Sequence, residues 1–271
     1  MGYLFDPSNW EWITSGNNLK FLFTGFLANI EIALVAMVLS LILGLILALL
    51  RLSKNGPISW LTGAWVDVWR NLPLIFILLF LFLLLPDNMK EGWADFAPDF
   101  FPTAFQSSGL PAAIVGLTLY NSAVIAEIFR AGIVSLERGQ GEAAAALGLP
   151  YWKSMRLVIL PQGLRRMVPA TVSQLITLNK DTTLVSLILI EEALKRAKIV
   201  INTSGSPFTG TGVPAPTLHV YLTIGLMFVL VNLALSRLSK RLEIKERKRT
   251  GTDLTGITGT EDHVALAADV D

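Results

Sequence analysis

Long hydrophobic runs separated by short polar segments form the main pattern of the sequence. The clearest run, Ile32–Leu50, contains no charged residue. It is close to the length of about 20 residues that a helix needs to cross a bilayer. The pattern therefore predicts an all-α membrane protein with five transmembrane helices, near residues 28–51, 62–85, 110–134, 168–190 and 217–236.

Small residues recur at every fourth position of the first predicted span. They are Ala36, Ser40, Gly44 and Ala48. Residues with this spacing lie on one face of a helix, and small side chains there let a second helix approach closely. The first span is therefore expected to pack tightly against a neighbour through this face.

The second predicted span is the least regular. Its purely apolar part, Leu72–Leu85, is too short to cross the membrane alone, so the helix is expected to begin before it. Pro73 lacks a backbone donor and is expected to kink the helix. For Arg70, two interpretations stay open: its charged end extends to the membrane surface and pairs with Asp67, or it acts in gating or substrate handling.

Composition agrees with a membrane protein and narrows the chemistry. The chain is 52% hydrophobic and 16% charged, whereas soluble domains carry about 25% charged residues. It has no cysteine and two histidines, so we expect neither disulfides nor a metal site. The net charge of +1 does not point to nucleic acid. The N-terminus lacks the basic and short apolar regions of a cleaved signal peptide.

Positive charges are distributed unevenly between the predicted spans. Most of the 22 Lys and Arg residues follow the first, third and fifth spans. The positive-inside rule places these segments in the cytoplasm. The N-terminal segment 1–20 is thus expected outside, and both the loop 135–166 and the tail 237–271 inside. The tail is basic and then acidic, and its last part is expected to be disordered.

The cytoplasmic loop 135–166 is polar but favours helix. Glu142 begins an alanine-rich helix that Gly148 should end. Pro150 suits the first turn of a second helix, which Pro161 should end. A face of alanines can enter a groove of a partner closely, but such a helix can also pack beneath its own bundle. The residues alone leave these two interpretations open.

Polar residues also occur in the middle of the third and fourth predicted spans. Ionised groups there must face protein or water, because exposure to lipid costs several kcal/mol. They either line a polar path for a zwitterionic substrate or bond structurally across helices. Glu127 and Arg130 are three residues apart and are expected to pair, in a gating or structural role. The substrate-path candidates are Tyr120, Asn121, Ser122, Asn179, Lys180, Asp181, Thr182 and Thr183.

One spacing in the loop resembles a known family. Glu142-Ala143-Ala144, Gly148 and Val158-Ile159-Leu160-Pro161 follow the pattern E-A-A-x3-G-x9-I-x-L-P, with Val158 in place of the isoleucine. This pattern is similar to the EAA loop of ABC-importer membrane subunits. The strings RNLPL, AEIFRAGI and KDTTL resemble the polar amino acid permeases of histidine, glutamine and glutamate importers. The Asn-Leu after Arg70 departs from the usual glycine-threonine.

This resemblance implies a type I ABC importer permease of the bacterial cytoplasmic membrane. Two permease subunits would form the path, ABC ATPase subunits would hold ATP and Mg²⁺, and an extracytoplasmic binding protein would deliver the amino acid, with glutamate or glutamine preferred. The chain itself would bind no cofactor, and it carries no glycine-rich phosphate loop. The residues implied in docking the ATPase are Glu142, Ala143, Ala144, Gly148, Leu160 and Pro161.

Two other classes of protein make different predictions. An ion-gradient-driven secondary transporter or channel subunit would transport without an ATPase and would leave the alanine-rich loop without a role. A membrane enzyme would need a catalytic constellation, and no Ser/His/Asp or metal-binding pattern is present in the sequence.

Overall fold

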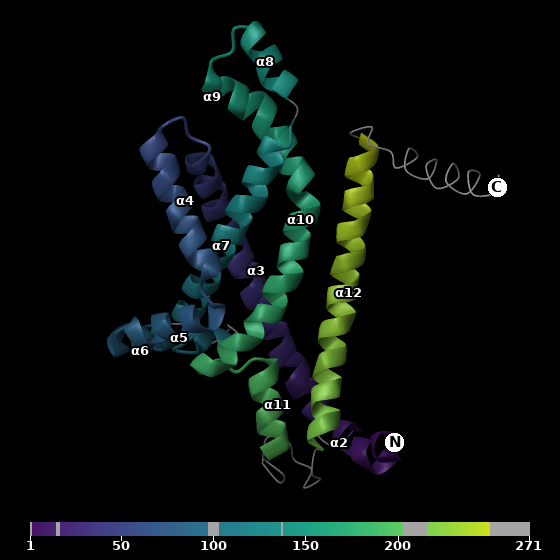
Figure 1. Cartoon of the computed structure of the whole chain (residues 1–271). Helices are drawn as coiled ribbons and strands as arrows, with labels where there is room; N and C mark the ends of the chain where they lie inside the picture. The colour runs from purple at the N-terminus through teal and green to yellow at the C-terminus, as the bar shows by residue number, and fades with distance from the viewer. Residues whose placement is uncertain (1, 15–16, 97–102, 137, 203–215, 250–271) are drawn as a thin grey trace, which may run out of the picture.

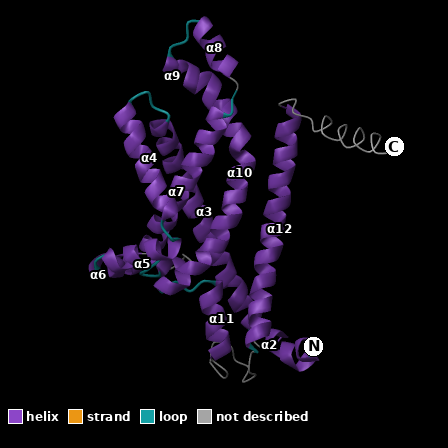
Figure 2. Ribbon diagram, in the orientation of Figure 1, coloured by secondary structure: helices purple, strands orange, loops and turns teal. Residues whose placement is uncertain are grey.

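The computed structural model describes residues 2–14, 17–96, 103–136, 138–202 and 216–249. All regular elements in these ranges are helices (Figure 2). Four long helices run lengthwise, with the helices α8 and α9 at one end and the N-terminus at the other (Figure 1). The long helices are α3 (Asn18–Arg51), α7 (Leu110–Val134), α10 (Leu160–Asp181) and α12 (Thr217–Arg249).

The shorter helices connect and flank these four. They are α1 (Gly2–Phe5), α2 (Glu11–Thr14), α4 (Gly56–Asn71), α5 (Leu74–Leu84), α6 (Asp87–Phe96), α8 (Arg138–Ala146), α9 (Tyr151–Ser154) and α11 (Ala193–Asn202). Three 3₁₀ segments, Pro7–Trp10, Thr103–Gln106 and Thr182–Ile188, and one π-helical turn, Met155–Ile159, complete the described elements.

Helices α3 and α7 form the centre of the bundle. The predicted small face of α3 is confirmed, because Ala36, Ser40, Gly44 and Ala48 are all buried. A Cβ atom added to Gly44 would lie 2.6 Å from Ile125 Cγ2 and 3.0 Å from the Ser122 carbonyl oxygen of α7. The two backbones thus approach as closely as small residues permit. The opposite face of α3 exposes large apolar side chains, including Val38, Ile42 and Ile46.

Among the described residues, fewer helices qualify as candidate spans than the five predicted. Helices α3, α7 and α12 are long and apolar enough to cross a membrane, and the bent pair α4–α5 can count as a fourth. Helix α10 does not qualify, since polar residues such as Gln174, Lys180 and Asp181 lower its mean hydropathy. The expected span 168–190 is also not one helix: α10 begins earlier, at Leu160, and a 3₁₀ segment follows Asp181.

The expected second span, 62–85, is divided by a bend of 100° between α4 and α5. Helix α4 ends at Asn71, and both Leu72 and Pro73 have extended backbone angles. Proline disfavours the helical conformation of the residue before it, and at Leu72 the chain takes the extended conformation, so it turns here rather than merely kinking. Helix α5 then packs on α7 through Leu78, close to Gly116.

Both ends of the bundle are more helical than predicted. Helix α3 begins at Asn18, and the short helices before it bury Trp12 in a second apolar cluster with Phe26, Ala197 and Val220. Helix α12 continues to Arg249, so the basic part of the expected tail extends this helix. The acidic part, 250–271, lies outside the described residues.

Candidate functional site

Helix α8, which carries the Glu-Ala-Ala pattern, lies at the tip of the molecule (Figure 1). Glu142, Ala143, Ala145 and Ala146 are exposed, and only Ala144 of the alanine run is buried. Leu147 is 81% exposed. The alanine face is therefore not covered by the chain's own bundle, which favours the docking interpretation over packing beneath the bundle.

Gly148 ends α8 by adopting a left-handed backbone conformation that suits glycine. Its φ of +74° lies in the left-handed region, which residues with a Cβ avoid at a cost of about 1–2 kcal/mol. The amide of Leu149 donates to the Ala144 carbonyl at 3.0 Å, and that of Gly148 to the Ala145 carbonyl at 2.9 Å. These two bonds are the Schellman motif, which satisfies the last carbonyls of the helix.

Pro161 does not end the second loop helix, contrary to the prediction. The chain continues from α9 through the π-helical turn Met155–Ile159 into α10, with Pro161 in the first turn of α10. A π turn shifts the hydrogen-bond register by one residue, and the Leu160 amide donates to the Met155 carbonyl. Because the π turn has already lengthened the hydrogen-bond spacing just before Pro161, the helix continues past a residue that lacks a backbone donor.

The loop leaves and rejoins the bundle where α7 and α10 cross closely. A Cβ atom on Gly132 would lie 2.9 Å from the Gly163 carbonyl oxygen and would overlap Met167. A Cβ atom on Gly163 would lie 3.2 Å from Ile133 Cα. Arg166 adds a hydrogen bond of 2.9 Å to the Ser135 carbonyl oxygen just beyond the end of α7. This crossing holds both ends of the loop together.

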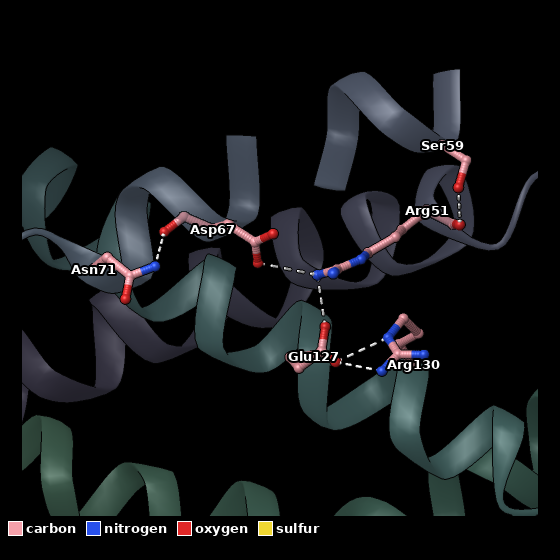
Figure 3. Close-up of polar contacts among 6 residues, drawn as sticks. All are labelled: Arg51, Ser59, Asp67, Asn71, Glu127 and Arg130. Atoms are coloured by element: carbon pink, nitrogen blue, oxygen red, sulfur yellow. Dashed lines mark hydrogen bonds and ion pairs between the residues drawn. The ribbon is translucent and has the colours of Figure 1, made fainter. Parts of the chain in front are cut away.

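An ion-pair cluster joins α3, α4 and α7 (Figure 3). Arg51 Nη1 lies 2.7 Å from Glu127 Oε2 and 3.7 Å from Asp67 Oδ1. Arg130 Nε donates to the other Glu127 oxygen at 2.9 Å, so the predicted Glu127–Arg130 pair is confirmed. The expected Asp67–Arg70 pair is wrong: Asp67 faces Arg51 instead, and Arg70 is exposed.

The polar residues of the third and fourth predicted spans do not gather in one place. Asn121 of α7 is fully buried and accepts a hydrogen bond of 2.7 Å from Gln174 of α10. Asn179 of α10 donates to Asn232 of α12 at 3.2 Å. Ser122 bonds within α7, to the Leu119 carbonyl oxygen, while Tyr120 is half-buried. Hydrogen bonds between side-chain amides thus link α10 to α7 and to α12.

The last three candidates lie where α10 changes into a 3₁₀ helix. Lys180 is exposed, and no ion pair joins it to Asp181 within the described part of the chain. Thr183 donates to the Lys180 carbonyl oxygen at 2.8 Å and Thr182 to that of Asn179 at 2.7 Å. These hydroxyls therefore support the break in the helix.

Thr182 also belongs to a buried polar cluster around Glu192, which is 0% exposed. Asn29 of α3 donates to Glu192 Oε2 and to Thr182 Oγ1, both at 3.0 Å. The Glu192 carboxylate also accepts the amides of Leu194 and Lys195 at the start of α11. Burial raises the pKa of Glu192, and these donors partly offset the effect.

Sequence reasoning missed five of the residues that form these contacts. Asn29, Gln174 and Asn232 interrupt apolar stretches, so their polarity was a usable signal. Glu192 follows the exposed Glu191, and nothing in the sequence distinguishes the buried carboxylate from the solvated one. Arg51 directly follows the apolar run Ile32–Leu50, and its position there indicates only the end of a span.

The molecule combines long apolar helices, a core joined by hydrogen bonds between side-chain amides, and an uncovered helix–glycine–helix loop at one end. These are features of a multi-pass membrane transport subunit. Comparison of the sequence with family models identifies the family. Residues 40–248 match the model of the binding-protein-dependent transport system inner membrane component, and the chain belongs to this family of ABC permease subunits. Such subunits are not themselves ATPases.

Curated relatives are amino acid permeases. The chain is 36% identical over 234 residues to the probable glutamine ABC transporter permease protein GlnP of Bacillus subtilis (strain 168), covering 86% of this chain and 96% of the relative. It is 34% identical over 196 residues to the glutamate/aspartate import permease protein GltK of Escherichia coli O157:H7, covering 72% and 84%.

Solved structures show the same fold. A chain of an amino acid ABC transporter crystallised with histidines superposes with a TM-score of 0.64 at 26% identity, covering 84% of this chain and 94% of that one. A chain of the MetNI methionine ABC transporter, in an inward-facing conformation, gives a TM-score of 0.59 at 21% identity over 83% and 97% of the two chains. The latter likeness concerns the fold alone.

Proposed function

We propose that this chain is one of two membrane subunits of an ATP-driven importer for polar amino acids. The observation that carries the proposal is the Glu-Ala-Ala loop, which combines the family spacing with an uncovered alanine face and a glycine-capped end. An ATPase subunit, which holds ATP and Mg²⁺, docks on this face. The second membrane subunit is an identical chain or a sister permease.

The proposed orientation follows the distribution of positive charge. The loop with α8 and α9, together with the basic end of α12, faces the cytoplasm of a bacterium, and the N-terminus lies outside the cytoplasmic membrane. Five crossings would then require both the bent pair α4–α5 and the polar α10 to traverse the bilayer. Helix α10 can cross the bilayer because the side-chain amides of Gln174 and Asn179 form hydrogen bonds with α7 and α12 instead of facing lipid.

Glutamine or glutamate is the proposed substrate, supported by the names of the curated relatives. The reconstituted complex, with its ATPase and binding protein, is expected to take up labelled glutamine or glutamate. A tenfold excess of either unlabelled compound should compete with this uptake. A panel of basic, aromatic and aliphatic amino acids is the control. Competition by a basic amino acid alone would overturn this substrate assignment while leaving the importer class intact.

The coupling role of the loop is tested by Gly148→Leu. The left-handed φ strains leucine by about 1–2 kcal/mol, and the change should shift the end of α8. We expect the variant to lose ATPase binding and ATP-driven uptake while its thermal midpoint stays near that of the wild type, because open space surrounds Gly148.

Gly139→Leu is the matched control, because Gly139 lies in α8, just before the alanine run, also in open space but without a positive φ. It should retain ATPase binding. An ion-gradient-driven transporter would behave differently: its uptake would continue without the ATPase and would be unaffected by Gly148→Leu. The family membership does not favour that alternative.

For the substrate path, we propose that Tyr120, Asn121, Ser122 and the segment 179–183 contribute polar groups to the route between α7 and α10. Asn121→Ala and Thr183→Ala are expected to reduce uptake in the assembled transporter. Thr177→Ala, on the exposed face of α10, serves as the control. Uptake and basal ATP hydrolysis that both stay at wild-type levels would remove the tested residues from the route.

A further inference from the structure

Tyr151, the first residue of α9, connects the loop to a turn that is distant in sequence. Its hydroxyl donates to the Leu52 carbonyl oxygen at 3.3 Å, in the turn between α3 and α4. The ammonium of Lys54, from the same turn, lies 4.8 Å from the centroid of the Tyr151 ring. Both the polar and the aromatic part of the side chain therefore contact a single segment.

The turn that Tyr151 contacts is itself firmly attached to the bundle (Figure 3). The carbonyl oxygen of Arg51, next to Leu52, accepts a hydrogen bond of 2.6 Å from Ser59 of α4. The Arg51 side chain bonds Glu127 of α7 at 2.7 Å. A displacement of this turn would therefore be passed to α3 and α4 and, through Arg51, to the middle of the cluster around Glu127.

The position of Tyr151 on the loop suits the transfer of movement from α8 and α9 to the α3–α4 turn. It follows Pro150 directly and precedes the π-helical turn that leads into α10. The loop is joined covalently only to α7 and α10. Tyr151 adds a direct, non-covalent connection from α9 to the turn between α3 and α4.

We propose that Tyr151 is a positioning residue that couples the loop to the α3–α4 turn, so that movements of α8 and α9 are passed to both pairs of helices together. This inference rests on the proposed function, in which an ATPase moves the loop. Tyr151 acts through Leu52 and Lys54 and has no part in binding the ATPase or the amino acid.

The test uses the complete reconstituted transporter and measures amino acid taken up per ATP hydrolysed. Tyr151→Phe keeps the ring and loses the hydroxyl, and Tyr151→Ala loses both. We expect the amount of amino acid taken up per ATP to fall about threefold in Tyr151→Phe and about tenfold in Tyr151→Ala. These values correspond to the loss of one or two weak contacts. ATPase affinity and the KM for the amino acid should stay unchanged. Tyr221→Phe, at an exposed tyrosine of α12, is the control.

The outcomes separate the two proposals. A wild-type complex that neither binds an ATPase nor takes up amino acid overturns the proposed function itself. A wild-type complex that couples normally, with Tyr151→Ala coupling equally well, overturns only the role of Tyr151. Loss of ATPase binding in Tyr151→Ala would also overturn it, because the residue would then belong to the docking surface.

The chain has no cysteine, so a second measurement can use introduced cysteines as its only reactive thiols. Lys54→Cys combined with Tyr151→Cys can be joined by a short bifunctional thiol reagent. If the loop and the turn move as one unit, the linked protein should retain its uptake per ATP. A linked protein that binds the ATPase but no longer transports would show that the contact must break during transport, which contradicts the proposal.

Discussion

Gly44→Val is expected to leave little folded protein. The first carbon of the new side chain would lie 2.6 Å from Ile125 Cγ2, 2.9 Å from its Cβ and 3.0 Å from the Ser122 carbonyl oxygen. None of these atoms is the end of a flexible side chain, so α3 and α7 must separate. Overpacking of this kind costs about 3 kcal/mol at the upper end of the usual range. The yield of monodisperse protein and its thermal midpoint in detergent provide the measurement.

Gly225→Val is the matched control for this change. It places the same β-branched residue in another long apolar helix, α12, where a Cβ atom meets nothing within 4 Å. Both variants carry the same intrinsic helix propensity, so the difference between them isolates the contact of α3 with α7. Equal yields and midpoints for the two variants would show that this contact is not the centre of the bundle.

Glu192→Ala is expected to have the second largest effect. The change removes the cap of α11, which is worth about 1 kcal/mol, and leaves the buried Asn29 amide without one acceptor, at a cost of about 1–3 kcal/mol. We expect a total loss of about 2–4 kcal/mol, seen as a lower thermal midpoint. Limited proteolysis should show α11 released from α3.

Glu191 provides the control, since it is the adjacent glutamate but is exposed. Glu191→Ala should change stability by less than about 0.5 kcal/mol. Glu192→Gln is the informative intermediate. Its amide oxygen can replace Oε2, which accepts from Asn29 and from the Leu194 amide, whereas its nitrogen cannot accept from the Lys195 amide as Oε1 does. If alanine at 191 were as damaging as alanine at 192, the polar cluster would not be responsible.

Periodic and local signals in the sequence were sufficient for several elements. The four-residue spacing of small residues predicts the face by which α3 meets α7. The residues that follow Glu142 predict a helix that stops at a left-handed glycine. Both rest on short-range physics, namely helix geometry and backbone sterics, which does not depend on what the segment packs against.

Elements that depend on context were predicted less well. Pro161 is a helix breaker by residue type, but the π turn before it lets the helix continue. The charged and amide side chains of α10 lower its mean hydropathy, so it does not resemble a transmembrane helix. The residues that bond these amides, Asn121 and Asn232, are distant in sequence and cannot be found from local spacing. The pairing of Asp67 with Arg51 rather than Arg70 arises from the packing of α3 on α4, which local spacing does not contain.

The glycine crossing of α7 and α10 separates the stability of the bundle from the fold of the loop 135–166. Gly132 and Gly163 bring the two ends of the loop together, so one extra residue in an exposed part of it, such as beside Gly139, adds only a small closure entropy. The same insertion would shift α8 relative to Tyr151 and its contact with the α3–α4 turn. Changes of sequence in the loop are therefore expected to be limited by the proposed coupling rather than by folding.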